Sequence, residues 1–189
     1  MSLEYSDINF MRSGTVKQQE AFHALKDSRI FEILSDYTPF LAGTIPLDIY
    51  IKDSDLDIIC QAEDFNSFSK LVQSEFGTCT SYKSYQTEVR GRPSLVIQFF
   101  LKGFQFEIFC QNTPIFEQFA VIHFIVEKRI LDIHGDKVRN DIRKLKEMGL
   151  KTEPAFAKYF NILGDPYLEL AKLNNLTDAK IKSIKPKSI

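Results

Sequence analysis

The chain is poor in cysteine, and its cysteines are not arranged as cross-links or zinc ligands. Only three are present, Cys60, Cys79 and Cys110, an odd number at wide spacing. This pattern favours free thiols in a reducing compartment over a disulfide framework. No two of them have the short spacing of zinc ligands, which argues against a structural zinc site. We therefore expect all three to be core thiols.

A long, uninterrupted apolar run is also absent. The longest apolar stretch, 115–131, is interrupted by polar side chains: Glu117, His123, Glu127, Lys128 and Arg129. Such a stretch does not have the composition of a membrane-spanning helix. The opening residues, 1–7, lack both the basic and the apolar region of a secretory signal. We therefore expect a cytoplasmic protein with no membrane partner.

Neither sign of charge is in excess. The 189 residues include 24 Lys and Arg against 25 Asp and Glu, so the chain lacks the overall positive field that holds long nucleic acid. A small molecule or a protein is the expected partner. Lysines near the C-terminus form a basic run that is typical of a solvated, frayed end. They are Lys180, Lys182, Lys185 and Lys187.

Two carboxylates separated by one apolar residue, Asp55-Leu56-Asp57, are the strongest chemical signal in the sequence. On a strand their side chains point the same way. A carboxylate facing an apolar interior usually binds a cation or a basic partner, because burying an unpaired charge is unfavourable. Magnesium, which binds carboxylates together with substrate phosphates, is one such partner. The alternative is that 52–55 is a polar hairpin turn at the mouth of a strand, and the local pattern favours neither.

A glycine and a hydroxyl residue precede this acidic pair. Gly43-Thr44 follows an apolar run at 40–42 and is separated from Asp55 by residues 45–54. Gly43 would let the backbone approach a phosphate, and Thr44 adds a hydroxyl beside it. The order is therefore a strand, a phosphate-sized turn, and a strand that carries metal ligands.

This segment resembles the signature of the nucleotidyltransferase superfamily, whose fold is that of polymerase beta and the aminoglycoside nucleotidyltransferases. In that signature an apolar strand is followed by Gly-Ser, a loop and Asp-x-Asp. Gly43-Thr44 stands in for Gly-Ser with the hydroxyl retained, and Ser54-Asp55-Leu56-Asp57 matches the acidic end. The resemblance implies that Gly43, Thr44 and Ser54 contact a nucleotide and that both aspartates bind metal.

Further segments resemble one little-characterised bacterial family within that superfamily, a domain of unknown function. They are Gly43-Thr44-Ile45-Pro46 and Lys151-Thr152-Glu153-Pro154-Ala155-Phe156-Ala157. This second resemblance implies a fold, and it implies no substrate.

The superfamily uses a third acid from a neighbouring strand, and Glu107 is the matching carboxylate. Two β-rich runs, 94–100 and 104–110, are joined by Lys102-Gly103, which predicts a tight hairpin. In the second run Phe104, Phe106, Ile108 and Cys110 share one face, leaving Gln105, Glu107 and Phe109 on the other. The superfamily more often has Asp here, so this acid is one methylene longer. The alternative is a solvated strand residue.

A triad of Asp55, Asp57 and Glu107 implies phosphoryl or nucleotidyl transfer with two magnesium ions, for which manganese can substitute. One ion would polarise the attacking oxygen and the other the leaving pyrophosphate, with both aspartates bridging the ions. Glu107 would hold the metal on the acceptor side and help to remove the acceptor's proton. Much of the catalysis would then be positioning and charge neutralisation.

The expected fold is α+β, a nucleotidyltransferase-like mixed β-sheet with flanking helices and a helical C-terminal portion. We assign 1–112 to the α/β core with its N-terminal helices, and 113–189 to a helical portion packed on the core. No internal repeat or low-complexity linker argues for a further division.

Local signals place the helices and strands. The first 37 residues read as helical, with Thr15 and Gln18 resembling a capping box. Asp64 caps a second helix that Gly77 ends. The stretch 78–110 reads as strands broken at Gly91-Arg92-Pro93 and Lys102-Gly103. After Asn112 the sequence predicts helices that begin at Thr113-Pro114, Gly135-Asp136, Thr152 and Asp165-Pro166.

Some polar residues have a functional and a structural interpretation. His123 and Glu127 lie four apart on one helix face, and they form a hydrogen-bonded pair or reach toward a substrate base; a satisfied core histidine is the favoured reading. Arg90 and Arg92 flank a turn and have the forked guanidinium that suits a triphosphate, although arginines are common in surface turns.

Two functions from different classes follow. The first is a metal-dependent nucleotidyltransferase that moves a nucleoside monophosphate from a nucleoside triphosphate to a small-molecule or protein hydroxyl. The second is a catalytically inactive module of the same fold that binds a nucleotide or a protein partner. Retention of three acids favours the enzyme. The loop residues 45–48 favour the module, because they lack the small and basic residues that many relatives use to hold phosphate. The sequence leaves the nucleotide, the acceptor and the oligomeric state open.

Overall fold

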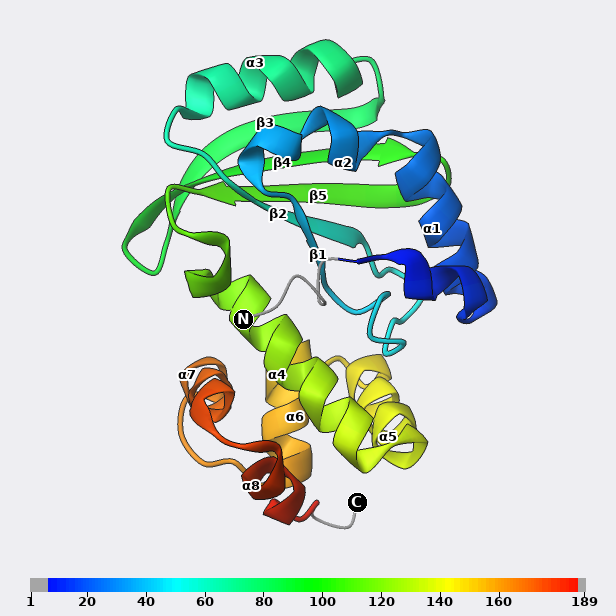
Figure 1. Cartoon of the computed structure of the whole chain (residues 1–189), viewed down its shortest axis with the longest axis vertical. Coiled ribbons are helices and arrows are strands. Elements are labelled where there is room, and N and C mark those ends of the chain that lie inside the picture. The colour runs from blue at the N-terminus through cyan, green and yellow to red at the C-terminus, as the bar shows by residue number, and fades with distance from the viewer. Residues whose placement is uncertain (1–6, 187–189) are drawn as a thin grey trace. The chain divides into compact units, whose positions relative to one another are not determined.

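The computed structural model describes residues 7–186 and divides the chain into two compact units (Figure 1). The first unit comprises the chain up to Pro46 together with Ser54–Gln118. The second comprises Leu47–Asp53 together with the chain from Phe119 onward. The backbone therefore passes from one unit to the other at residues 46–47, 53–54 and 118–119.

The first unit is built on one mixed sheet. Its strands, in the described part of the chain, are β1 (Phe40–Ala42), β2 (Leu56–Gln61), β3 (Thr80–Val89), β4 (Arg92–Leu101) and β5 (Phe104–Gln111). They lie in the order β1-β2-β5-β4-β3, with β2 and β5 parallel and the other neighbours antiparallel. The predicted α+β fold, a mixed sheet with flanking helices and a helical C-terminal part, is confirmed.

Helices of the first unit cover one face of this sheet. They are η2 (Asn9–Ser13), α1 (Val16–Asp27), α2 (Ile30–Ile33), η3 (Ser35–Tyr37) and α3 (Phe65–Phe76). The predicted capping box is present, because the side chains of Thr15 and Gln18 each bond the other's backbone. Asp64 caps α3 as predicted. The region predicted as helical consists of several helices, with Arg29 adopting a positive φ of 54° between α1 and α2, and residues 1–6 lie outside the described part.

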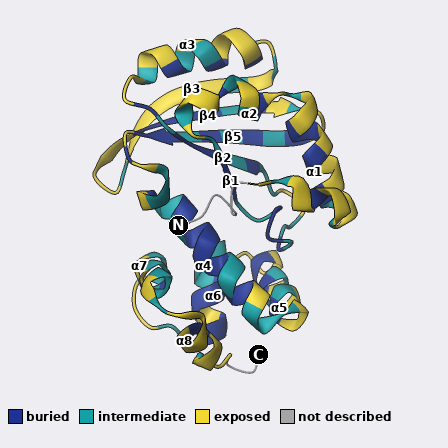
Figure 2. Cartoon of the chain, viewed as in Figure 1, coloured by how far each residue is buried: buried dark blue, intermediate teal, exposed yellow. Residues whose placement is uncertain are grey.

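The β4–β5 hairpin confirms the predicted alternation of faces. Phe104, Phe106, Ile108 and Cys110 are buried, whereas Gln105, Glu107 and Phe109 are half-buried. On the core face Phe99 stacks between Phe76 of α3 and Phe106, with ring centroids 4.8 and 5.2 Å apart. The edge strand β3, by contrast, is exposed along most of its length (Figure 2). The predicted strand break falls at Arg90-Gly91, because Arg92 and Pro93 already belong to β4.

The second unit is helical. It contains α4 (Phe119–His134), α5 (Asp136–Glu147), α6 (Thr152–Phe160), α7 (Pro166–Lys172), η5 (Leu173–Asn175) and α8 (Asp178–Ser183). The helix expected to begin at Thr113-Pro114 is instead a single 3-10 turn, η4 (Ile115–Glu117), followed by an extended Gln118. The starts of α5, α6 and α7 agree with prediction, whereas α8, whose N-terminus is capped by the side chain of Thr177, was not predicted.

The apolar stretch 115–131 is divided between the 3-10 turn η4, the extended Gln118 and the first part of α4. No helix in the described part of the chain has the length and hydrophobicity of a transmembrane helix. Lys180, Lys182 and Lys185 are exposed, as expected for a solvated run, and Lys187 lies outside the described residues.

Candidate active site

Gly43 and Asp57 are in close contact where β1 ends. Ala42, the last residue of β1, lies directly opposite Asp57 of β2. Gly43 then turns the chain with a φ of +77°, a value that strains residues with a side chain. A Cβ atom at this position would lie 1.9 Å from Oδ2 of Asp57. The glycine therefore leaves the space that the Asp57 carboxylate occupies.

Two of the predicted acids are neighbours across parallel strands. Asp57 of β2 pairs in register with Glu107 of β5, and both side chains are half-buried. Asp55 lies two residues earlier in the same alternation, directly before β2. Leu56 and Ile58, on the opposite face, are fully buried. The parallel pairing thus sets Asp57 and Glu107 side by side, and Asp55 lies just outside the strand.

Gln98 is the direct neighbour of Glu107 on the other side. The two residues pair in register across β4 and β5, and Nε2 of Gln98 donates a 2.7 Å hydrogen bond to Oε2 of Glu107. Lys83 of β3 is the next residue in the same cross-strand row. The row therefore runs Asp57, Glu107, Gln98 and Lys83 across four neighbouring strands, with one carboxylate oxygen of Glu107 held by an amide.

The two predicted hydroxyls also lie together. Oγ1 of Thr44 donates to Oγ of Ser54 at 3.1 Å, which closes the mouth of the loop between β1 and β2. The chain turns at Lys52-Asp53, directly before Ser54 and Asp55. Because β1 and β2 are antiparallel, the turn and the juxtaposition of Gly43 with Asp57 are parts of the same hairpin.

The donor atoms suit a hard cation, but the side chains are not gathered around one. The set consists of the carboxylates of Asp55, Asp57 and Glu107 with the hydroxyls of Thr44 and Ser54, all of them oxygen donors of the kind magnesium prefers. Within residues 7–186 no group of three or more His, Cys, Asp or Glu side chains is arranged to hold a metal ion. The backbone register therefore suits the acids, whereas their side chains do not yet converge.

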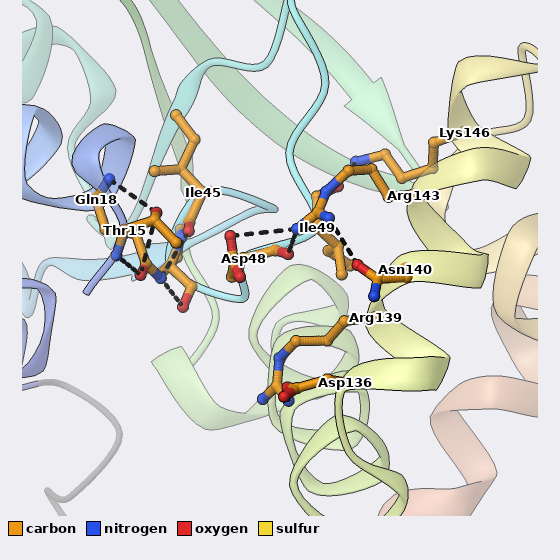
Figure 3. Close-up of polar contacts among 11 residues, drawn as sticks. Thr15, Gln18, Ile45, Asp48, Ile49, Asp136, Arg139, Asn140, Arg143 and Lys146 are labelled. Carbon is orange, nitrogen blue, oxygen red and sulfur yellow. Dashed lines mark hydrogen bonds and ion pairs between the residues drawn. The ribbon is translucent and has the colours of Figure 1, made fainter.

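Gln18 of α1 holds the first half of the loop. Its buried amide Nε2 donates to the carbonyl oxygens of Ile45 and Pro46 at 3.1 and 3.0 Å, while Oε1 accepts from the backbone of Thr15 (Figure 3). Ile45 is itself fully buried. The loop is therefore a packed segment whose carbonyl groups face a helix, and sequence reasoning assigned Gln18 only to the cap.

Gln98 was also missed, although a signal for it existed. A two-residue hairpin at Lys102-Gly103 pairs Leu101 with Phe104, and counting outward from that pair sets Gln98 opposite Glu107. The contacts of Gln18 with the loop had no such signal, because 27 and 28 residues separate the partners.

The two arginines considered for phosphate binding are not near the acids. Arg92 begins β4, six residues before Gln98, which is roughly 20 Å along a strand. Its guanidinium donates to Oγ1 of Thr113 at 3.1 Å. Arg90 occupies the adjoining turn with a φ of 53°. Both residues lie at the far end of the β3–β4 hairpin from the predicted site.

His123 is a satisfied core residue of the second unit, as favoured. Its Nδ1 lies 3.0 Å from Oε1 of Glu153, and its Nε2 lies 2.8 Å from the carbonyl oxygen of Tyr167. Burial, the largest influence, opposes ionisation of Glu153, but the His123 hydrogen bond, a backbone hydrogen bond and the charges of His123 and Lys146 together outweigh it, and the pKa of this carboxyl is lowered. Glu127 is also buried. The segment Lys151-Thr152-Glu153-Pro154 thus supplies the partner of His123.

The fold is shared with solved nucleotidyltransferases. A structure of the Cid1 poly(U) polymerase matches with a TM-score of 0.55 at 12% identity, covering 86% of this chain and 56% of that one. A MgGTP-bound structure of the same polymerase matches with a TM-score of 0.53, also at 12% identity, over 86% and 53% of the two chains. The polymerase core of TRAMP, an RNA surveillance complex, matches with a TM-score of 0.51 at 13% identity, over 85% and 57%.

These likenesses show the fold alone, because the identities are low. The chain spans little more than half the length of the proteins it matches. The resemblance to the nucleotidyltransferase superfamily is confirmed at the level of the fold. A comparison with curated proteins finds no match. The model of the domain of unknown function DUF4269 matches residues 23–173, and the chain therefore belongs to that family.

Proposed function

We propose that the protein is a metal-dependent nucleotidyltransferase that moves a nucleoside monophosphate from a nucleoside triphosphate to a hydroxyl of a small molecule or protein. The observation that carries this proposal is the in-register pairing of Asp57 with Glu107, with Gly43 leaving space for the Asp57 carboxylate. The MgGTP-bound polymerase of the same fold supports magnesium and a triphosphate as the ligands.

In this proposal Asp55, Asp57 and Glu107 hold the metal. When bound, magnesium would supply positive charge to the triphosphate and to the attacking oxygen. Thr44 and Ser54 contact the phosphates through their hydroxyls, and Gly43 lets the backbone approach them. These residues bind and orient the donor, so that the rate gain comes mainly from positioning and charge neutralisation.

The transfer step exchanges one phosphorus–oxygen bond for another. The acceptor oxygen forms a bond to the α-phosphorus, the bond from that phosphorus to the bridging oxygen breaks, and pyrophosphate leaves. Glu107 accepts the proton of the acceptor hydroxyl. Gln98 donates to Oε2 of Glu107 at 2.7 Å and so holds this carboxylate in place. Gln98 is a positioning residue in this scheme.

A second candidate is an inactive module that binds a nucleotide or a protein partner. Two observations favour it. The three acids do not converge into a metal cluster within the described residues. The loop residues Ile45, Leu47 and Ile49 are buried apolar side chains and offer no basic group to a phosphate.

A thermal-shift experiment tests whether the protein binds a nucleoside triphosphate in a magnesium-dependent way. The four ribonucleoside triphosphates are added with and without magnesium, because a ligand bound only by the native state raises the melting temperature. We expect a magnesium-dependent rise that Asp55→Asn and Asp57→Asn abolish while the fold stays intact, since removing one of several like charges relieves repulsion. Asp53→Asn, an exposed acid of the same loop, is the matched control and keeps the rise.

Transfer is then measured as magnesium-dependent pyrophosphate release with candidate acceptors. Release by the parent and not by Asp57→Asn supports the enzyme. Equal nucleotide affinity in parent and Asp57→Asn, with magnesium present, would contradict the metal assignment. No response to any triphosphate favours the module.

A further inference from the structure

The loop between the candidate nucleotide-binding residues and the metal-binding strand is held by helix α5. The loop segment Leu47–Asp53 belongs to the second unit, together with α5. On either side of it the chain belongs to the first unit, where Pro46 precedes it and Ser54 follows. The residues that hold this segment therefore act on the stretch of backbone that leads directly into Ser54 and Asp55.

Two basic side chains of α5 bind consecutive carbonyl groups of this segment. Nη2 of Arg143 donates to the carbonyl oxygen of Asp48 and lies 3.3 Å from its carboxylate Oδ1. Nζ of Lys146 donates to the carbonyl oxygen of Ile49 at 3.0 Å. Figure 3 shows both side chains reaching from one helix face toward Asp48 and Ile49. Both contacts with Asp48 are made by the same nitrogen of Arg143, while its Nη1 donates to Oδ1 of Asn140 at 3.1 Å.

The Lys146 contact is buried, whereas the side chains of Arg143 and Asp48 are each 28% exposed. Lys146 is a buried residue, with 6% of its surface exposed. A buried ammonium requires polar partners, because its desolvation is otherwise unfavourable. Leu47 and Ile49, on either side of Asp48, are buried as well. Loosening this segment would expose apolar surface and leave a buried charge less well paired.

The backbone of Asp48 needs this support. Its φ is 55°, in the left-handed region that few residues with a side chain adopt. Its carboxylate Oδ1 is buried without a hydrogen bond of good geometry in the described structure, so the ion pair with Arg143 is its main compensation. Such strain persists where the surroundings hold the backbone in place. The strained residue lies within the loop that joins Thr44 to Asp55.

We propose that Arg143 and Lys146 are positioning residues for the site, because by holding Asp48 and Ile49 they restrain the segment of chain that leads into Ser54 and Asp55. This inference rests on the proposed function, since the site they position is the nucleotidyl-transfer site. Helix α5 thus restrains the loop through its contacts with the backbone carbonyl groups of Asp48 and Ile49. The basic residues hold the loop itself rather than the phosphate.

The first test is hydrogen exchange in Arg143→Met and Lys146→Met, which keep part of the aliphatic stem and remove the donors. Arg139→Met and Lys144→Met are matched controls on the same helix, because these side chains pair with acids of the helical unit: Asp132, Asp136 and Asp141. We expect amide exchange over residues 47–57 to rise about tenfold in the two test variants only. Equal exchange in test and control variants would overturn the proposal.

The second test is the magnesium concentration that gives half-maximal binding of a nucleoside triphosphate. A merely structural role lowers the melting temperature and leaves this concentration unchanged, whereas a positioning role raises it about tenfold, equivalent to about 1.4 kcal/mol. Arg143→Lys retains the positive charge but lacks the guanidinium group. This variant is measured in place of a methionine variant that does not fold. An intermediate rise is expected for it.

The outcomes distinguish this inference from the proposed function. If the parent binds no triphosphate in a magnesium-dependent way, the proposed function fails and the positioning role fails with it. If the parent binds and the half-maximal magnesium concentration is the same in Arg143→Met and Lys146→Met, the positioning role alone is overturned.

Discussion

Gly43 and Asp57 are so close that a single added carbon would collide with the acid, since a Cβ at Gly43 would lie 1.9 Å from Oδ2 of Asp57. Their closeness follows from the hairpin register, which places Ala42 directly opposite Asp57. The positive φ of 77° at Gly43 is the second reason for a glycine. The glycine thus serves both the turn and the position of the carboxylate.

Gly43→Ala is therefore expected to disturb the acid as well as the backbone. The strained φ alone is expected to lower the free energy of unfolding by about 1 kcal/mol, and the collision with Asp57 adds to this. We also expect loss of magnesium-dependent triphosphate binding, because Asp57 must move. Urea denaturation measures the first effect, and thermal shift with a triphosphate and magnesium measures the second.

Gly91→Ala is the matched control for this prediction. Gly91 has a similar φ of 73°, lies in the same unit, and has no atom within 4 Å of an added Cβ. It should lose about 1 kcal/mol of stability and keep its response to nucleotide. Identical nucleotide responses in Gly43→Ala and Gly91→Ala would show that the contact with Asp57 has no functional consequence.

Gln18→Leu is expected to destabilise the protein more than loss of the helix cap alone. It removes the amide that donates to Ile45 and Pro46 and leaves two buried carbonyls without it, for an expected loss of about 2 to 3 kcal/mol. Thr15→Ala removes only the capping hydroxyl and should lose about 1 kcal/mol. The midpoints of urea unfolding give both values. Equal losses in the two variants would mean that the loop contacts contribute nothing measurable.

The parts of the fold that were predicted correctly have local causes. The two caps, at Thr15 and Asp64, depend on residues two or three positions away. The alternation of β5 depends on the two-residue period of a strand. The hairpin at Lys102-Gly103 depends on a short turn, and both of its residues have positive φ, 52° and 84°. These signals lie within a few residues of the feature they determine.

The parts that were not predicted depend on contacts between residues far apart in the sequence, or on a local helix signal that a long-range contact overrides. Arg143 and Lys146 contact loop residues that lie 95 and 97 positions earlier in the sequence. No periodic pattern in the sequence predicts these contacts. Pro114 suggested a helix start, but a 3-10 turn and an extended Gln118 intervene before α4. Gln118 is held there because its amide donates to the carbonyl of Cys60, 58 residues away. The sequence singled out the three acids as candidates, whereas the hydrogen bond of Gln98 to Glu107 was not predicted.

Glu153→Gln is expected to remove a pH-dependent part of the stability. Burial opposes ionisation of Glu153, the His123 hydrogen bond favours it, and the net pKa is lowered. A carboxyl whose folded pKa is depressed contributes stability above its unfolded pKa, and loses that contribution as the pH falls through the folded pKa. We expect a loss of about 1 to 3 kcal/mol at pH 7 and a shallower decline below about pH 4.3.

Urea unfolding of parent and variant between pH 3 and pH 7 tests this expectation. Glu147→Gln, an exposed glutamate of the same unit, is the control and should stay within about 0.5 kcal/mol of the parent. Parallel stability curves for parent and Glu153→Gln across the acid range would show that the pair with His123 contributes nothing that depends on pH.

The three thiols are expected to differ sharply in reactivity. Cys60 and Cys110 are paired residues of β2 and β5 and are fully buried, whereas Cys79 is only half-buried, which corrects the prediction of three core thiols. Burial raises the pKa of Cys60 well above its usual range, with a smaller contribution from Cys110, and burial raises the pKa of Cys110 to about 12. Burial also raises the pKa of Cys79, but this thiol stays within reach of solvent.

A thiol reagent at pH 8 should therefore modify one cysteine in the folded protein and three in urea, because only an accessible thiolate reacts. Cys79→Ser should abolish the rapid phase and leave the total in urea at two. Cys60 and Cys110 alternate with Asp57 on β2 and Glu107 on β5, so their side chains lie on the face opposite the acids. Magnesium and nucleotide should therefore not block the slow reaction of Cys60 and Cys110 with the reagent directly. They should slow it only as far as they stabilise the native state. Rapid modification of two thiols in the folded parent would contradict the burial of the β2–β5 pair.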